Sequence, residues 1–123
     1  MSEIVKLPFY GKGEWKQSAT EKWRDVMDPS TGQVIAQAPC CTAAEVDETV
    51  AQAAEAYRTW SRTPVIRRTQ VLFQFRELLM EHMDELTYIL ARENGKVWEE
   101  ARGDLLKVKE PVELACGAPT LMM

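Results

Sequence analysis

Three cysteines are the side chains best suited to nucleophilic chemistry in this sequence, and they occur as the adjacent pair Cys40–Cys41 and as Cys116. A nucleophilic cysteine needs a stabilised thiolate, which a helix N-terminus or a cationic neighbour can supply. Cys116 is expected near the C-terminal end of a helix, where the helix dipole disfavours a thiolate. We therefore interpret Cys116 as a packing residue. Cys41 precedes a predicted helix start, and we favour its packing on Val46 as a hydrophobic staple over a reactive role.

A single histidine, two glutamates and a short glycine motif are the other candidates for chemistry. His82 has no cysteine or histidine partner at a metal-ligand spacing, so we expect a solvated or capping side chain. Glu93 and Glu100 could form an acid–base pair, but both fall where helix surfaces usually carry charge. Gly11-Lys-Gly13 precedes the strand-like Glu14-Trp-Lys16, whereas a dinucleotide-binding loop precedes a helix. These patterns identify no catalytic, cofactor-binding or metal-binding residue, and we expect no small-molecule site.

The elements that hold these residues begin with a β-hairpin region over the first forty-one residues. Leu7–Tyr10 and Glu14–Lys16 flank the glycine motif as a predicted hairpin. Lys22–Met27 and Gln33–Ala38 are predicted as two further strands. Asp28–Gly32 separates them with turn chemistry, since Pro presets φ, Asp bonds its own backbone and Gly accepts a left-handed conformation.

A helical region of three or four long helices is predicted from residue 42 to residue 123. Thr42-Ala-Ala-Glu45 is a capping box that begins the first helix. One apolar face follows at helical spacing, and it consists of Val46, Val50, Ala53, Tyr57 and Trp60.

The second helix is predicted to begin at Thr63-Pro64 and to end at Gly95 in a left-handed cap. Its apolar stripe is widened by further apolar residues, so we expect it to be nearly surrounded, with a bend or a new helix start near His82–Asp84. The stripe consists of Leu72, Phe75, Leu79, Met83, Leu86 and Leu90, widened by Val71, Phe73 and Leu78. A last helix is expected over Val97–Cys116, bent around Lys107–Pro111 or split in two, because proline disrupts a helix interior.

Composition and charge narrow the class of protein. The net charge is −4, with 15 basic and 19 acidic residues mixed along the helices, which argues against nucleic acid as a partner. The four tryptophans are therefore interpreted as core or interface residues. No apolar run approaches the ~18 residues of a transmembrane helix, and no secretory signal is visible at the N-terminus. We expect one domain in a cytoplasmic protein, or in a protein of the mitochondrial matrix after processing.

Three motifs resemble the N-terminal part of the NAD(P)-dependent aldehyde dehydrogenases. They are Asp28-Pro-Ser-Thr-Gly-Gln-Val-Ile-Ala36, Glu93-Asn-Gly-Lys96 and Cys116-Gly-Ala-Pro-Thr-Leu-Met-Met123. The last motif is most similar to the methylmalonate-semialdehyde dehydrogenase, CoA-acylating branch, and the resemblance covers nearly the whole chain. It implies a parent that oxidises a semialdehyde with NAD, with coenzyme A as an acyl acceptor in that branch. It also implies that the cofactor loop, the general-base glutamate and the nucleophilic cysteine lie beyond residue 123.

The resemblance singles out Lys107 as a candidate at the substrate entrance. In the semialdehyde branch an arginine at this helix position is associated with the substrate carboxylate, and here Arg102-Gly-Asp-Leu-Leu-Lys107 places a lysine in the matching register. Lysine keeps the charge of arginine but not its bidentate geometry. An exposed helix lysine without a role is the alternative interpretation.

Together these observations predict an α+β chain, residues 1–123, with a β-hairpin region over 1–41 and a helical region over 42–123. In the parent, the helices would cover the sheet of a Rossmann-like cofactor domain. We expect an N-terminal structural segment of an aldehyde dehydrogenase that is catalytically incomplete by itself. A stand-alone helical module for self-association or interaction is the alternative. In either case the apolar stripes need partners, so we expect the chain to self-associate.

Overall fold

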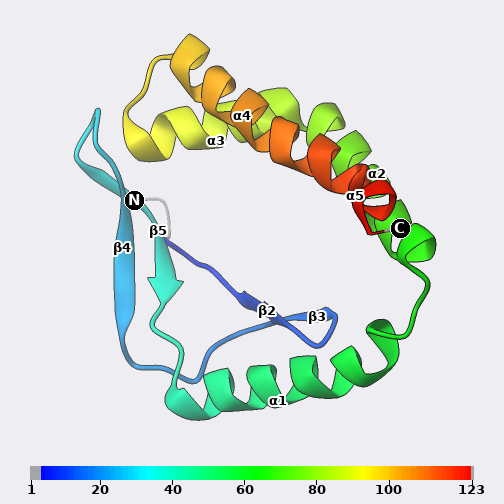
Figure 1. Cartoon of the computed structure of the whole chain (residues 1–123). Helices are drawn as coiled ribbons and strands as arrows, with labels where there is room; N and C mark the ends of the chain where they lie inside the picture. The colour runs from blue at the N-terminus through cyan, green and yellow to red at the C-terminus, as the bar shows by residue number, and fades with distance from the viewer. Residues whose placement is uncertain (1–3, 123) are drawn as a thin grey trace. The chain divides into compact units, whose positions relative to one another are not determined.

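The structure is a computed structural model that describes residues 4–122. The chain forms two compact units, Met1–Arg62 and Thr63–Met123. Figure 1 shows the strands and one helix in the first unit and the remaining helices in the second. The change from strands to helices was predicted at residue 42, whereas the compact units divide after the first helix. The predicted α+β class, with short strands followed by helices, is confirmed.

The N-terminal unit contains a hairpin and a separate three-stranded sheet. β2 (Phe9–Gly11) and β3 (Glu14–Lys16) pair antiparallel, and the turn between them uses positive φ at Lys12 and Gly13. The hairpin predicted from the glycine motif is therefore confirmed. Its exposed face carries Tyr10 and Trp15, whose rings meet edge to face with centroids 5.1 Å apart.

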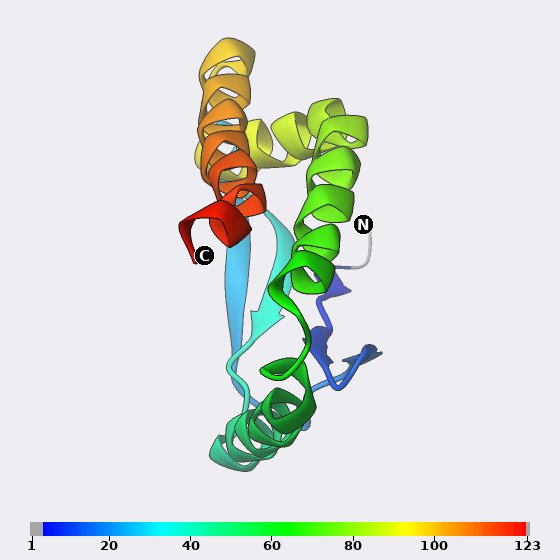
Figure 2. The ribbon, with the colours of Figure 1, turned by 45° about the vertical axis from the view of Figure 1, so that its right-hand side comes forward.

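The second sheet of this unit has the strand order β1-β5-β4. β4 (Trp23–Asp28) and β5 (Gln33–Pro39) confirm the two further predicted strands. They pair antiparallel, and Figure 2 shows them side by side. Asp28 closes their connection by accepting a hydrogen bond from the Ser30 N–H at 2.8 Å. The short strand β1 (Val5–Lys6) pairs parallel with β5 and was not predicted.

Helix α1 (Ala43–Trp60) begins with the predicted capping box. The N–H of Glu45 donates to Thr42 Oγ1 at 3.3 Å, and the N–H of Thr42 donates to Glu45 Oε2 at 2.7 Å. No residue of α1 is fully buried. Its predicted apolar face is present, but Val50 is 62% exposed and Tyr57 is 67% exposed.

The C-terminal unit packs four helices around a small core. α2 (Val65–Glu81) and α3 (Met83–Asn94) meet at His82, which confirms the predicted break, and Gly95 ends α3 with a φ of 64°. α4 (Trp98–Cys116) packs against both α2 and α3, and α5 (Ala118–Leu121) packs against α2 and α4 (Figures 1 and 2). Among the described residues of this unit, the buried ones are Thr69, Leu79, Met83, Thr87 and Ala101.

Two expectations about these helices differ from the structure. α4 continues through Pro111 as one helix, so the predicted alternative of two shorter helices is wrong, while the alternative of a bend stays a prediction. The α2–α3 stripe is not surrounded by the rest of the described chain, because Phe75 is 48% exposed and Leu78 is 54% exposed. Within the C-terminal unit, α4 and α5 pack on α2 and leave much of the stripe open.

Candidate functional site

Lys107 lies on α4 with its side chain 77% exposed. Its Nζ reaches Asp104 Oδ1 at 3.5 Å, which is the long limit of a hydrogen bond. The other oxygen of Asp104 accepts a close hydrogen bond from Lys96. That hydrogen bond from Lys96 is the main reason why the pKa of Asp104 is lowered. Lys96 therefore holds Asp104, while the ammonium of Lys107 remains loosely held and open to an anion.

The structure also describes the other candidates for chemistry in the C-terminal unit. Cys116 is the last residue of α4 and is half-buried, as a packing residue would be. The His82 side chain is 51% exposed, and its Nδ1 lies 2.9 Å from Glu85 Oε2. Glu93 and Glu100 are exposed. Among residues 4–122, no three His, Cys, Asp or Glu side chains gather as metal ligands.

The strongest polar cluster of the N-terminal unit surrounds the carboxylate of Glu45. Besides capping α1, this carboxylate accepts hydrogen bonds from Ser18 Oγ and from the Ala19 N–H, both at 2.8 Å. The N–H of Ala19 is the largest of several causes that lower the pKa of Glu45 to about 2. The capping box was predictable from Thr42 and Glu45, but the contacts with the loop before β4 were not.

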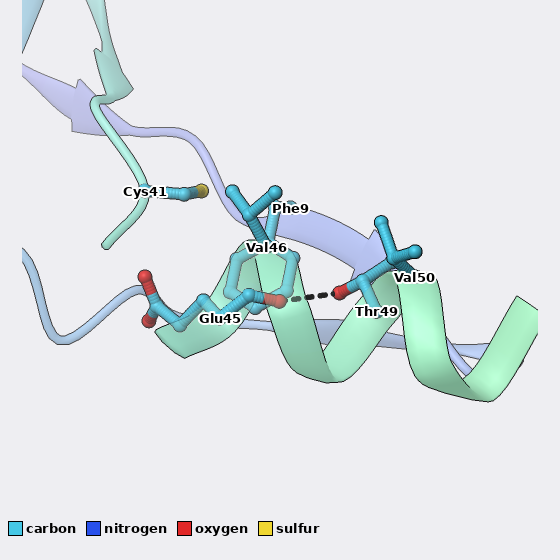
Figure 3. Close-up of a pocket in the computed structure, with 6 residues that line it drawn as sticks. All are labelled: Phe9, Cys41, Glu45, Val46, Thr49 and Val50. Carbon is cyan, nitrogen blue, oxygen red and sulfur yellow. Dashed lines mark hydrogen bonds between the residues drawn. The ribbon is translucent and has the colours of Figure 1, made fainter. Parts of the chain in front are cut away.

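A small apolar hollow of about 220 Å³ lies beside this cluster, between the hairpin and α1. Figure 3 shows its lining, in which Cys41 and Val46 lie on one side and Phe9 and Val50 complete the wall. Cys41 and Val46 both line this hollow, and the predicted staple contact between them stays a prediction. Thr49 Oγ1 donates to the backbone oxygen of Glu45 at 2.8 Å. The polar atoms at the rim are therefore already hydrogen-bonded.

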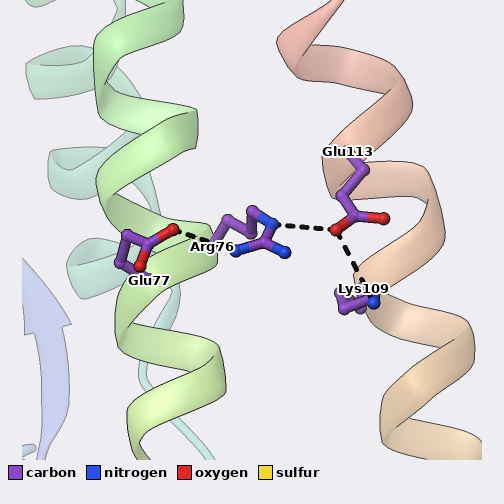
Figure 4. Close-up of polar contacts among 4 residues, drawn as sticks. All are labelled: Arg76, Glu77, Lys109 and Glu113. Carbon is purple, nitrogen blue, oxygen red and sulfur yellow. Dashed lines mark hydrogen bonds and ion pairs between the residues drawn. The ribbon is translucent and has the colours of Figure 1, made fainter.

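An ion-pair network joins α2 to α4 in the C-terminal unit, and Figure 4 shows its four side chains. Arg76 Nε donates to Glu113 Oε1 at 2.8 Å, and Arg76 Nη1 donates to Glu77 Oε1 at 2.9 Å. Lys109 Nζ lies 3.6 Å from the same oxygen of Glu113. The hydrogen bond from Arg76 is the main cause of the lowered pKa of Glu113. This network fixes how α4 lies on α2, and with it the position of Lys107 relative to α2.

Comparison with known proteins places this arrangement in a family. The sequence profile of the aldehyde dehydrogenase family matches residues 15–123. The chain belongs to this family. Malonate-semialdehyde dehydrogenases are among its similar relatives. Those of Listeria monocytogenes serotype 4a and Bacillus subtilis strain 168 are 46% and 45% identical over 123 residues. The alignment covers the whole of this chain and only 25% of each relative. The chain therefore spans about a quarter of the length of these aldehyde dehydrogenases.

Solved structures of the aldehyde dehydrogenase family share the fold of this chain. A protein of Sinorhizobium meliloti assigned as a methylmalonate-semialdehyde dehydrogenase, solved in complex with NAD, matches with a TM-score of 0.94 and 28% identity. The match covers 100% of this chain and 25% of that one. The methylmalonate-semialdehyde dehydrogenase of Oceanimonas doudoroffii matches with a TM-score of 0.85 and 32% identity, over 98% of this chain and 24% of that one.

Proposed function

We propose that this chain is the N-terminal structural segment of a semialdehyde dehydrogenase, whose complete form oxidises malonate semialdehyde or methylmalonate semialdehyde with NAD. The observation that carries the proposal is the alignment of all 123 residues, at 46% identity, with one quarter of a malonate-semialdehyde dehydrogenase. The match to a structure that contains NAD supports the choice of cofactor. In this proposal the segment supplies scaffold, and the remaining three-quarters of the enzyme supplies the reacting groups.

The proposed reaction transfers a hydride from the aldehyde carbon to NAD. Water then supplies the oxygen of the acid product. Transfer of the acyl group to coenzyme A instead of water, giving a thioester, is also part of the proposal and rests on the resemblance to the CoA-acylating branch. We assign no step of either reaction to a residue of this chain.

Lys107 is proposed to stand at the substrate entrance and to attract the carboxylate of the semialdehyde. Its 77% exposed side chain and its single long contact with Asp104 support this role. The ammonium would lose only that weak hydrogen bond on binding an anion. As a point charge, lysine would attract a carboxylate without fixing its orientation. The expected effect is therefore on the affinity for the substrate rather than on the chemical step.

A chimaera tests the proposed function. The chain would replace the aligned first quarter of the Bacillus subtilis malonate-semialdehyde dehydrogenase, and NADH formation would be followed with malonate semialdehyde. We expect activity within about tenfold of the parent, a loss of about 1.4 kcal/mol or less in transition-state stabilisation, and no NADH from the isolated chain. Omitting coenzyme A tests whether it is the acceptor. A folded chimaera that oxidises no semialdehyde would contradict the proposal.

Self-association is a second candidate function, and the exposed apolar side chains of α2 favour it. Val71, Phe73, Phe75 and Leu78 are each about half exposed. Leaving these four side chains open to water forfeits roughly 1.5 kcal/mol each, or on the order of 6 kcal/mol in all. That is comparable with the roughly 5–15 kcal/mol that stabilises a typical domain. Pairing of two copies would recover part of it, and closed two-fold pairing is the commonest form.

We propose a cytoplasmic location, or the mitochondrial matrix after processing. The support is chemical, because Cys40, Cys41 and Cys116 are all free thiols and disulfides form mainly in oxidising compartments. Among the described residues, no helix combines the length and the apolar character that crossing a membrane requires.

A further inference from the structure

The N-terminal unit carries an open apolar surface that its own residues do not cover. We call it the α1 face, and it consists of the hollow with Phe9, Cys41, Val46 and Val50, continued along the helix by Tyr57 and Trp60. Val46 and Val50 are 51% and 62% exposed although both line the hollow. Figure 3 shows their side chains beside Phe9. Such a patch marks an interaction site more often than ordinary protein surface does.

The chemistry of the hollow selects an apolar occupant. Its lining is almost entirely apolar. The carboxylate of Glu45 is engaged by Ser18, Ala19 and the cap of α1. The hydroxyl of Thr49 is engaged by the Glu45 backbone oxygen. The two polar oxygen-bearing side chains of the lining, Glu45 and Thr49, are thus already engaged within the chain. A volume of about 220 Å³ suits one large apolar side chain, because a cavity of about 150 Å³ takes up benzene.

The length of the relatives indicates where that side chain comes from. The chain matches its relatives over its whole length but covers only 25% of theirs. A solved chain about four times as long contains a segment with the same fold. A surface that is open in this segment is therefore available to the other three-quarters of a full-length relative. A second copy is the alternative occupant, but pairing of copies is proposed above for the exposed side chains of α2 and not for the α1 face.

We propose that the α1 face is the docking surface for the remaining three-quarters of an aldehyde dehydrogenase chain, with one apolar side chain of that part seated in the hollow. This inference rests on the proposed function but concerns a different residue set. It makes the α1 face an intramolecular interface that forms only in the complete enzyme.

The test compares one substitution in two settings, the isolated chain and the chimaera with the Bacillus subtilis enzyme. Val50→Lys places a charge on the α1 face, and Ala51→Lys places the same charge on the next helix position, which points about 100° away. Both positions are exposed in the isolated chain. We expect neither substitution to shift the thermal midpoint of the isolated chain by more than about 2 °C, since exposed substitutions have small effects. In the chimaera, Val50→Lys should lower the midpoint by more than about 5 °C and Ala51→Lys should not.

Equal effects of Val50→Lys in both settings would overturn the inference, because the side chain would then gain no cover from the rest of the enzyme. So would equal effects of the two substitutions in the chimaera. A dimer of the isolated chain that Val50→Lys dissociates and Ala51→Lys does not would assign the α1 face to a second copy, and would also overturn it. A stable chimaera without semialdehyde oxidation would contradict the proposed function while leaving the docking result readable.

Discussion

The carboxylate of Glu45 in α1 accepts a hydrogen bond from the backbone N–H of Ala19, 26 residues earlier, at 2.8 Å. The same carboxylate caps its own helix through Thr42 and accepts from Ser18 Oγ. One side chain therefore joins the loop before β4 to the first turn of α1. This contact ties α1 to the loop before β4 within the same compact unit.

Glu45 predicts how the N-terminal unit responds to acid. Its pKa is about 2 in the folded chain and 4.5 ordinarily. A lowered folded pKa gives stability that is fully present above about pH 4.5 and is lost as the pH falls towards 2. Glu45→Gln should be less stable at neutral pH and should lose less stability in this window. Urea midpoints of both proteins between about pH 6 and about pH 2.5 check this, and parallel losses would contradict it.

Two neighbouring leucines of α2 differ in burial and should therefore differ in their contribution to the stability of the C-terminal unit. Leu79 is 6% exposed and Leu78 is 54% exposed. Leu79→Ala should lower the free energy of unfolding by about 2–5 kcal/mol, because it removes buried methyl groups and leaves a cavity. Leu78→Ala should change it by less than ~0.5 kcal/mol. Denaturant unfolding of the isolated chain measures both, and losses of similar size would show that α2 is packed differently.

The exposed ring of Phe75 predicts how the isolated chain associates. Light scattering at micromolar concentration should detect a species of twice 14.0 kDa. Phe75→Asp should return the monomer and leave the helical circular dichroism unchanged, because Phe75 is 48% exposed. Leu79→Asp should abolish the fold, since Leu79 is buried, and Lys107→Ala should change neither assembly nor fold. A monomer at every concentration would rule out the pairing.

Lys107 predicts a selective change in substrate affinity. In the chimaera, Lys107→Ala should raise KM for malonate semialdehyde about tenfold, equivalent to about 1.4 kcal/mol. It should leave kcat and the KM of an uncharged aldehyde such as propanal unchanged. Lys107→Arg should retain the low KM, because the charge remains. A KM that changes equally for both aldehydes would assign Lys107 to the surface alone.

Local signals in the sequence predicted the elements well. Thr42 and Glu45 gave the start of α1, Gly95 gave the end of α3, and Gly11-Lys-Gly13 gave the hairpin. Each of these features depends on residues a few positions apart, so the local sequence is enough to determine the cap or the turn. Strand β1 and helix α5 were missed because they are short and carry no periodic pattern.

Burial and distant contacts could not be predicted in the same way. The apolar spacing of Phe75 and Val50 indicated a covered face, but spacing does not say whether the cover belongs to this chain. The contact of Arg76 with Glu113 and that of Ser18 with Glu45 join residues 37 and 27 positions apart. Such contacts depend on how the helices and loops meet. The resemblance to a family supplied Lys107, which no local pattern separates from other exposed lysines.

The most direct test of the central claim is to read the source coding sequence past the codon for Met123. If the chain is the structural segment of a semialdehyde dehydrogenase, the reading frame continues for about three times the present length. It then encodes a cofactor loop, a general-base glutamate and a nucleophilic cysteine. A reading frame that closes directly after Met123 in the source genome, with the 123-residue chain accumulating in cells, would contradict this account and favour the self-associating module.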